Sequence, residues 1–252
     1  MSGKNAVVER VALVTGASTG IGRAVAERLQ ADGFALGFHS HRDDEESRRS
    51  FEEAEARGPA AWIVGDVGDP DAGERLVREA MEALGRLDVL VNNAGITVSK
   101  PALELTAEDF DAIFSVDVKG AFLLSVAAAR EMRRRGSGVI VNVTSVHEHV
   151  PRPGFALYAS AKAALGMLTR SLALELAPEI RVNAVAPGAI ATERNEEADE
   201  LDPEIPFGRP GRPEEVAAAV SYLAGPDAGY VSGASLLVDG AMAQQVLARP
   251  AG

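Results

Sequence analysis

Three side chains in the middle of the chain have the types and the spacing of a proton-transfer site. Tyr158 and Lys162 are four positions apart, so on a helix they project from one face. A cation held beside a phenol favours the phenolate, which makes the phenol a proton donor and acceptor at cellular pH. Ser145 ends an apolar run that predicts a buried strand, and strand ends are where α/β sheets place chemistry.

Alternating strands and helices are expected to position these side chains. Apolar runs predict strands at 11–14, 34–38, 61–64, 89–91, 139–144, 181–186 and 235–238. The segments between them predict helices at about 21–32, 43–57, 70–84, 106–135, 158–176 and 213–223. Fully apolar strands in repeated strand–helix units indicate an α/β fold, a doubly wound Rossmann-type parallel sheet with helices on both faces. We expect one domain over 1–252, with an ordered core at about 10–242, a lid at 191–210 and a loose tail at 243–252.

A glycine-rich turn separates the first expected strand from the first helix. Its glycines let the backbone of Thr15–Gly22 turn sharply and approach a pyrophosphate at the helix N-terminus. Because the spacing differs from G-x-G-x-x-G, the turn alone is only suggestive. Two more motifs, Asp66-Val67 and Asn92–Gly95, close the third and fourth strands at the same edge of the sheet. The candidate cofactor contacts here are Gly16, Ser18, Thr19, Gly20, Ile21, Gly22, Asp66, Val67, Asn93, Ala94 and Gly95.

The composition limits the classes of function open to the chain. Its 252 residues carry a formal net charge of −12, with no basic tract beyond Arg133–Arg135, which argues against nucleic-acid and anionic-membrane partners. The absence of cysteine excludes disulfides, thiolate metal sites and cysteine nucleophiles. With no signal sequence and no apolar run approaching about 20 residues, a cytoplasmic protein is expected.

Taken together, these motifs resemble the classical short-chain dehydrogenase/reductase family over about 10–242. Two later segments, Asn183–Gly188 and Val231–Gly240, are similar to the family's segment beneath the nicotinamide and to its closing strand. The resemblance implies a seven-stranded parallel sheet, an NAD(P)(H) cofactor and a homotetramer, with a dimer as the alternative. The further cofactor contacts that it implies are Tyr158, Lys162, Pro187, Gly188, Ile190 and Thr192.

The same resemblance assigns the catalytic roles. Tyr158 gives or takes the alcohol proton while a hydride moves to or from the nicotinamide, which supplies the redox chemistry. Lys162 promotes the phenolate and holds the nicotinamide ribose, and Ser145 hydrogen-bonds the substrate oxygen.

The fourth catalytic position departs from the family pattern. An asparagine within Asn-x-x-Gly is typical, and Asp117 takes its place in Asp117–Gly120. If a backbone carbonyl at a local bulge is the group required, aspartate serves equally well. If the side chain matters, its carboxylate adds negative charge that opposes the phenolate. We expect an active enzyme with a shifted pH optimum.

The end of the second strand favours NADP(H). NAD enzymes place a carboxylate there for the ribose 2′-hydroxyl, whereas a 2′-phosphate needs a basic group. Ser40 stands at or next to the acidic position, His41 and Arg42 follow, and no acid occurs before Asp43. NADP(H) is the expected cofactor, with NAD(H) as the alternative.

Two histidines after Ser145 raise the question of a metal. His147 and His149 flank Glu148, but no third ligand is in view, so we expect no metal here. His147 is expected to border the substrate instead.

Two subgroups of the family compete for the substrate assignment. Ser145–Glu148 and 205–215 are similar to bacterial glucose 1-dehydrogenases, whereas Asn93–Thr97 is closer to 3-oxoacyl-acyl-carrier-protein reductases. Such reductases typically carry arginines on two helices near the entrance. Arg130 matches one of these positions, and Leu174 stands at the other.

The acidic segment between Thr192 and Phe207 would repel an acidic carrier protein. A small neutral sugar, polyol or ketone is therefore favoured as the substrate. An acyl-carrier-protein or polyketide ketoreductase is the first alternative, and a catalytically impaired NADPH-binding sensor module is the second.

Overall fold

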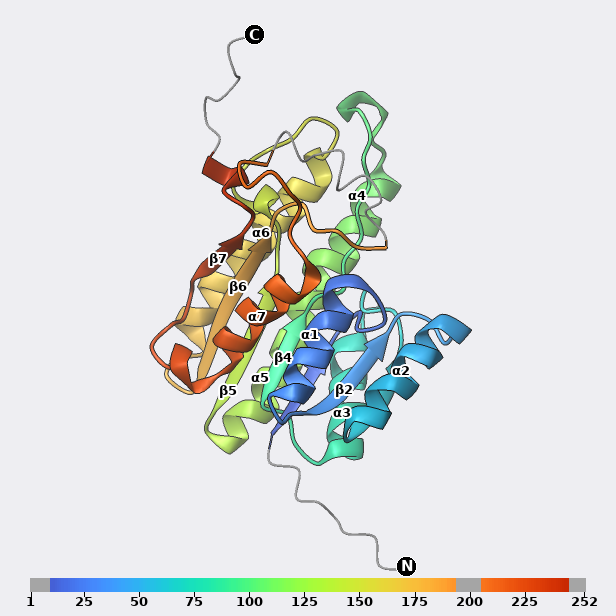
Figure 1. Cartoon of the computed structure of the whole chain (residues 1–252), viewed down its shortest axis with the longest axis vertical. Helices are drawn as coiled ribbons and strands as arrows, with labels where there is room; N and C mark the ends of the chain where they lie inside the picture. The colour runs from blue at the N-terminus through green and yellow to red at the C-terminus, as the bar shows by residue number, and fades with distance from the viewer. Residues whose placement is uncertain (1–9, 194–204, 245–252) are drawn as a thin grey trace, which may run out of the picture.

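Seven parallel strands form one sheet in the order β3-β2-β1-β4-β5-β6-β7 (Figure 1). The computed structural model describes residues 10–193 and 205–244. The strands are β1 (Val11–Val14), β2 (Ala35–Ser40), β3 (Ala60–Val64), β4 (Val89–Asn92), β5 (Gly138–Val143), β6 (Ile180–Pro187) and β7 (Ser235–Val238). Every neighbouring pair is parallel, so all seven carboxyl ends meet at one edge, the carboxyl edge of the sheet. The predicted doubly wound parallel sheet is confirmed.

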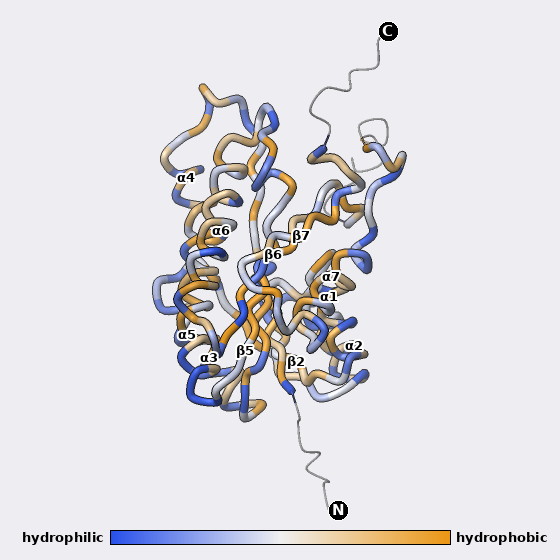
Figure 2. Tube along the Cα trace, turned by 90° about the vertical axis from the view of Figure 1, so that its left-hand side faces the viewer, coloured by the Kyte–Doolittle hydropathy of each residue, from blue (hydrophilic) through white to orange (hydrophobic). Residues whose placement is uncertain are grey.

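Helices cover both faces of the sheet. Seen edge-on in Figure 2, α1, α2 and α7 lie on one side, and α3, α4, α5 and α6 lie on the other. The helices are α1 (Gly20–Ala31), α2 (Glu45–Arg57), α3 (Ala72–Leu84), α4 (Ala107–Phe114), α5 (Ala121–Arg135), α6 (Ala156–Glu175) and α7 (Pro213–Ala224). Short 3₁₀ turns are η1 (Ala102–Glu104), η3 (Val146–Glu148), η5 (Pro226–Ala228) and η6 (Met242–Gln244).

The strands are buried on both faces, as their unbroken apolar sequences require. Alternate residues of β1 belong to different cores: Ala12 and Val14 pack beneath α1 and α7, whereas Val11 and Leu13 pack beneath α3 and α5. This sandwich fixes the sheet, and with it the positions of the loops that leave the carboxyl edge.

The long helical run at 107–135 differs from the single helix that the sequence predicts. Thr106 caps α4 through the expected capping box with Asp109. The backbone then widens into a π-helical turn, η2 (Ser115–Gly120), before α5 begins. By length and composition this run could cross a membrane, contrary to the sequence expectation, but half of it is buried inside the protein. Its packing against α3, β4 and α6 identifies it as a core helix.

A network of buried polar side chains lies beneath the carboxyl edge. Asn92 Nδ2, at the end of β4, donates to Asn142 Oδ1 on β5 at 2.8 Å and to Ser125 Oγ on α5 at 2.9 Å. Asn142 Nδ2 donates in turn to Thr169 Oγ1 on α6 at 2.8 Å. Because buried polar groups are costly when unpaired, this chain of bonds sets the register between two strands and the two helices behind them.

Candidate active site

Ser145, Tyr158 and Lys162 converge on a cleft of about 720 Å³ at the carboxyl edge. Ser145 is the second residue after β5. Tyr158 and Lys162 lie one helical turn apart in the first two turns of α6. Lys162 Nζ lies 5.5 Å from the centre of the Tyr158 ring. The structure thus brings together the three side chains that the sequence singled out.

The Ser145 hydroxyl is oriented by the turn that follows it. Its Oγ accepts a hydrogen bond from the His147 backbone N–H at 3.2 Å. With that lone pair occupied, its own O–H remains available to donate to an oxygen in the cleft. Ser145 is 7% exposed, so such a bond forms largely out of water.

Lys162 forms a buried ion pair with Asp117. Nζ lies 2.9 Å from Oδ2 of Asp117, and the two side chains are 5% and 0% exposed. The other carboxylate oxygen accepts the Ile96 backbone N–H at 2.8 Å. Nζ also donates to the Val143 carbonyl at 3.2 Å, which ties α6 to the end of β5. Asp117 is therefore bound to the cation of the site and does not face the open cleft.

This ion pair decides the charge state of Lys162. Burial alone disfavours the ammonium, but the Asp117 carboxylate, with a smaller contribution from Tyr158, outweighs it and raises the pKa of Lys162. The ammonium beside the Tyr158 ring consequently persists at every pH at which the fold is expected to work. It can stabilise negative charge on the phenol oxygen.

The π-helical turn η2 is what carries Asp117 to this position. The extra residue in the turn presents the carboxylate to the loop after β4, where a Cβ on Gly95 would lie 3.0 Å from Asp117 Oδ2 and 3.2 Å from Lys162 Nζ. A side chain there would press on the pair, so glycine suits this position. The local bulge considered from the sequence is present, and the side chain is engaged as well.

The glycine-rich turn is packed too closely for other residues. Gly16 has φ +65°, and a Cβ on Gly22 would lie 2.0 Å from the Gly16 carbonyl oxygen. Asn93 braces the turn by donating from Nδ2 to the carbonyls of Thr15 at 2.8 Å and Gly16 at 3.1 Å. The first turn of α1 has neither an acidic side chain nor a side-chain cap, so its amides suit a pyrophosphate. The residues present therefore fit a dinucleotide.

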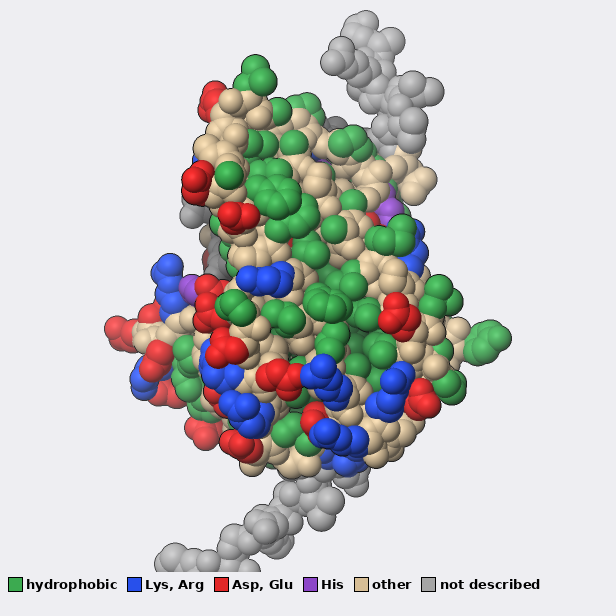
Figure 3. Space-filling view, turned by 180° about the vertical axis from the view of Figure 1, so that it is seen from behind, with side chains coloured by type: hydrophobic (Ala, Val, Ile, Leu, Met, Phe, Trp, Pro, Cys, Tyr) green, Lys and Arg blue, Asp and Glu red, His purple; other side chains and the backbone are tan. Residues whose placement is uncertain are grey.

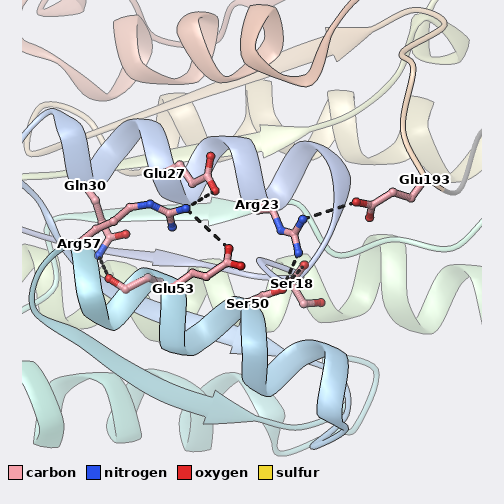
Figure 4. Close-up of polar contacts among 9 residues, drawn as sticks. Ser18, Arg23, Glu27, Gln30, Ser50, Glu53, Arg57 and Glu193 are labelled. Carbon is pink, nitrogen blue, oxygen red and sulfur yellow. Dashed lines mark hydrogen bonds and ion pairs between the residues drawn. The ribbon is translucent and has the colours of Figure 1, made fainter.

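A second brace of this turn comes from α1 and α2 (Figure 4). Arg23 donates to Ser50 Oγ at 2.7 Å, and Ser50 donates to the Ser18 carbonyl at 3.0 Å. Arg23 also reaches Glu193 at 3.5 Å, in a partly exposed pair that contributes little by itself. Together these bonds hold the turn against α2 and beside the segment that follows β6.

A second cavity of about 560 Å³ extends from the glycine-rich turn to the ends of β2 and β3. Ser40, His41 and Arg42 line it, as expected for the ribose end of a dinucleotide. The nearby Asp44 carboxylate is occupied as the N-cap of α2, where it accepts the Ser47 N–H at 2.9 Å.

Most of the predicted contacts fall in these two cavities. Those in the first are Ile21, Asn93, Gly95, Ser145, His147, Tyr158, Lys162, Pro187, Gly188, Ile190 and Thr192. Those in the second are Gly16, Ser18, Thr19, Ser40, His41, Arg42, Asp66, Val67, Ala94 and Gly95. Gly20, Gly22 and Asp117 lie behind the lining. Of the expected lid at 191–210, the structure describes only 191–193 and 205–210.

Within the His-Glu-His segment, Glu148 and His149 lie together, with Oε2 and Nε2 3.7 Å apart, and only His147 turns to the cleft. His147 lines the cleft, whereas His149 Nε2 contacts Ser235 Oγ at 3.2 Å. Glu148 is buried, accepts from Ser235 Oγ at 2.9 Å and lies against Gly166 of α6. Glu148 therefore anchors the loop to the scaffold.

Several site residues were not identified from the sequence. Arg152 and Phe155 line the cleft but belong to an irregular loop without a periodic pattern. His39 lies inside an apolar strand, where it accepts the Gly16 N–H on Nδ1 at 3.2 Å and faces the Gly65 carbonyl with Nε2 at 3.0 Å. The alternation of β2 gave no sign of this bridge between the turn and β3.

Comparison with known proteins agrees with this geometry. The model of a family described as enoyl-(acyl carrier protein) reductase matches residues 16–243. The chain is 44% identical over 239 residues to the uncharacterized oxidoreductase YohF of Escherichia coli, covering 92% of this chain and 94% of that one. It is 42% identical to 3beta-hydroxysteroid dehydrogenase 1 of Eggerthella lenta over 92% and 93% of the two chains. The crystal structure of acetoin dehydrogenase from Enterobacter cloacae superposes with a TM-score of 0.88 at 44% identity, covering 97% and 100%.

Other similar proteins have a range of named substrates. Glucose 1-dehydrogenase 2 of Bacillus subtilis is 38% identical, covering 92% and 94% of the two chains. The 3-oxoacyl-[acyl-carrier-protein] reductase of Synechocystis is 39% identical, covering 94% and 98%. A gluconate 5-dehydrogenase of Burkholderia cenocepacia, solved with NADP and tartrate, is 32% identical with a TM-score of 0.88, covering 94% and 96%.

The environment of His39 predicts a pH-dependent stability. Burial lowers its pKa from 6.5 to about 4, so the folded protein keeps it neutral while the unfolded chain binds a proton below 6.5. Neutral His39 contributes fully to the free energy of unfolding above pH 6.5, and this contribution is lost as the pH falls toward 4. The difference between the two pKa values corresponds to about 3 kcal/mol. Urea unfolding at a series of pH values should show a shallower dependence in His39→Asn than in wild type. The exposed His41→Asn is the control, and an unchanged slope in His39→Asn would contradict the assignment.

Proposed function

Because the chain belongs to the classical short-chain dehydrogenase/reductase family, we propose that it is an NAD(P)(H)-dependent oxidoreductase that interconverts a small alcohol and its ketone. The observation that carries the proposal is the convergence of Ser145, Tyr158 and Lys162 on one cleft beside a glycine-rich turn that suits a dinucleotide. Relatives named as dehydrogenases and reductases support the reaction class.

The proposed proton transfer follows from the orientation of the two hydroxyl groups. In ketone reduction, Ser145 donates a hydrogen bond to the carbonyl oxygen and Tyr158 gives that oxygen its proton. In alcohol oxidation, the Tyr158 phenolate removes the hydroxyl proton. The nicotinamide supplies or accepts the hydride when bound.

Lys162 stabilises the phenolate charge on Tyr158, and Asp117 keeps Lys162 in place. The buried ion pair holds the ammonium 5.5 Å from the centre of the phenol ring. The residues proposed to hold the nicotinamide half are those after β6, from Pro187 to Thr192, which line the same cleft.

A small polar substrate is favoured over a carrier-bound acyl chain. Similar proteins are named for acetoin, glucose and gluconate. Arg130 is engaged with Glu74, and the position matching the second carrier-docking arginine is Leu174, which is 83% exposed. An acyl-carrier-protein reductase remains the alternative, supported by the matching family description and the Synechocystis relative.

NADP(H) is the proposed cofactor form. Arg42 and His41 line the second cavity at the end of β2, where a ribose 2′-phosphate would lie. At the position where NAD enzymes carry an acid stands Ser40, which donates to Ser47; of the acids that line the cavity beside it, Asp44 is engaged as the N-cap of α2.

A homotetramer is the proposed assembly. The face formed by α4, α5 and α6 carries gathered hydrophobic side chains (Figure 3), among them Phe110, Phe122, Met167 and Leu174. Leu236 on β7 is also exposed. Exposed apolar areas of this kind are typical of subunit contacts. Sedimentation velocity tests the assembly, and a monomer would contradict it.

The proposed function is tested by following cofactor absorbance at 340 nm. Wild type is supplied with NADPH or NADH together with ketones or an acetoacetyl thioester free of carrier protein, and with NADP⁺ or NAD⁺ together with sugars. Small ketones or sugars should be turned over, and Tyr158→Phe should lower kcat by about 10²- to 10⁴-fold while NADPH binding is retained. Preferential reduction of the thioester would support the acyl reductase. Tight NADPH binding without turnover of any substrate would support a sensor module.

Removing Arg42 should change the choice of cofactor. Arg42→Ala is expected to raise KM for NADPH by about 10-fold or more and to leave KM for NADH within about 2-fold, because one charged hydrogen bond to the 2′-phosphate is lost. Arg49→Ala, an exposed arginine on α2 outside the cavity, is the control. Equal effects on both cofactors would exclude a role for Arg42 in recognising the phosphate.

Replacing Asp117 by asparagine should shift the pH–rate profile. Without the carboxylate, the ammonium of Lys162 is uncompensated and stabilises the phenolate more, so the acid limb of alcohol oxidation moves down by about one pH unit. The pKa of Lys162 loses the influence that raises it while burial remains, so the basic limb also moves to lower pH. Asp111→Asn, exposed on α4, is the control. A profile identical to wild type would deny the carboxylate any special role.

A further inference from the structure

His147 lines the cleft that holds Ser145 and Tyr158 but has no part in the proton transfer described above. It occupies η3, two residues after Ser145, and lines the same cleft as Tyr158. Its backbone N–H positions the Ser145 hydroxyl. The imidazole itself is left without an assigned role.

The hydrogen bond at Nδ1 determines what the rest of the ring can do. Nδ1 of His147 lies 2.9 Å from the Val150 carbonyl oxygen. A carbonyl only accepts, so Nδ1 carries the proton, and in the neutral ring Nε2 is then an acceptor. Among residues 10–193 and 205–244, no group hydrogen-bonds or pairs with this Nε2. His147 therefore lines the cleft with an acceptor atom, Nε2, that has no partner among the described residues.

The plane of the His147 ring is held by aromatic contacts. The ring stacks on Phe155, with centroids 5.4 Å apart and an interplanar angle of 27°. It meets the Tyr158 ring edge-on, with centroids 6.1 Å apart and an angle of 81°. Arg152 covers the other ring of the stack, at 5.6 Å from the Phe155 centre. Such fixed geometry is what a site needs in order to distinguish substrates by a hydrogen bond.

The His147 ring centre lies 6.1 Å from that of Tyr158 in the same cleft, so a group one carbon away from an oxygen bound by Tyr158 would come near this imidazole. A hydroxyl on that carbon can donate to Nε2, whereas a hydrogen atom or a second carbonyl cannot. We propose that His147 selects substrates with a hydroxyl group on the carbon adjacent to the reacting carbon. These substrates are α-hydroxy ketones in reduction and 1,2-diols in oxidation. This assignment rests on the proposed alcohol–ketone chemistry.

The experiment uses three ketones with one carbon skeleton: 3-hydroxybutan-2-one, butan-2-one and butane-2,3-dione, each with NADPH. His147→Phe keeps a flat ring for the Phe155 stack and the backbone N–H for Ser145, but it removes the acceptor. We expect the ratio of kcat/KM for the hydroxy ketone over butan-2-one to fall about 10-fold, the size of one hydrogen bond. The dione-to-butanone ratio should change by less than about 2-fold.

Two further variants separate selection from general damage. His147→Gln retains a side-chain acceptor and should recover part of the lost ratio. His149→Phe, whose imidazole contacts Ser235 away from the cleft lining, should leave the ratio at the wild-type value. An unchanged ratio in His147→Phe, or an equal loss for all three ketones, overturns the selection. Failure of wild type to reduce any ketone or to oxidise any sugar overturns the proposed function itself, and the selection falls with it.

Discussion

The buried ion pair between Lys162 and Asp117 is the interaction on which the site depends. Removing two charges from water is expensive, and the cost is offset only when the remaining atoms are also bonded. Here the Ile96 amide adds one hydrogen bond to Asp117 and the Val143 carbonyl adds one to Lys162. The pair thereby joins the π-helical turn, the loop after β4, the end of β5 and α6 at one point. The position of Tyr158, one helical turn before Lys162, follows from it.

Beneath this pair, hydrogen bonds between neutral side chains hold the strands and helices of the scaffold together. The Asn92, Asn142, Ser125 and Thr169 network links the same two strands and the same helical layer without any charge. Neutral hydrogen bonds hold the scaffold, and the buried Lys162–Asp117 pair lies next to the proton-transfer group, Tyr158. Thr15 adds a similar link by accepting the Asn93 and Ala94 amides at 2.9 and 3.0 Å, which joins β1 to β4.

The fold was predictable because buried parallel strands have unmistakable apolar sequences, and Tyr158 and Lys162 were recognisable because their spacing is local. The contact between Asp117 and Lys162 was not, since it joins distant segments through a turn whose widening leaves no mark in the helical pattern. His39 and Asn142 could not be recognised for another reason. Each lies within an apolar run, and such a run predicts a buried strand without indicating that one of its residues makes polar contacts. The helix at 106–135 was placed correctly at both ends and wrongly in the middle.

Because of the π-helical turn, the number of residues in Ser115–Gly120 is itself important for the site. Each residue advances an α-helix by about 100°, so deletion of a single residue within 115–120 would restore a regular helix and turn everything before it relative to α5. Asp117 would then face away from Lys162, although no residue type had been lost. In this segment the number of residues matters as much as their identity, and a comparison of relatives should find no gaps there.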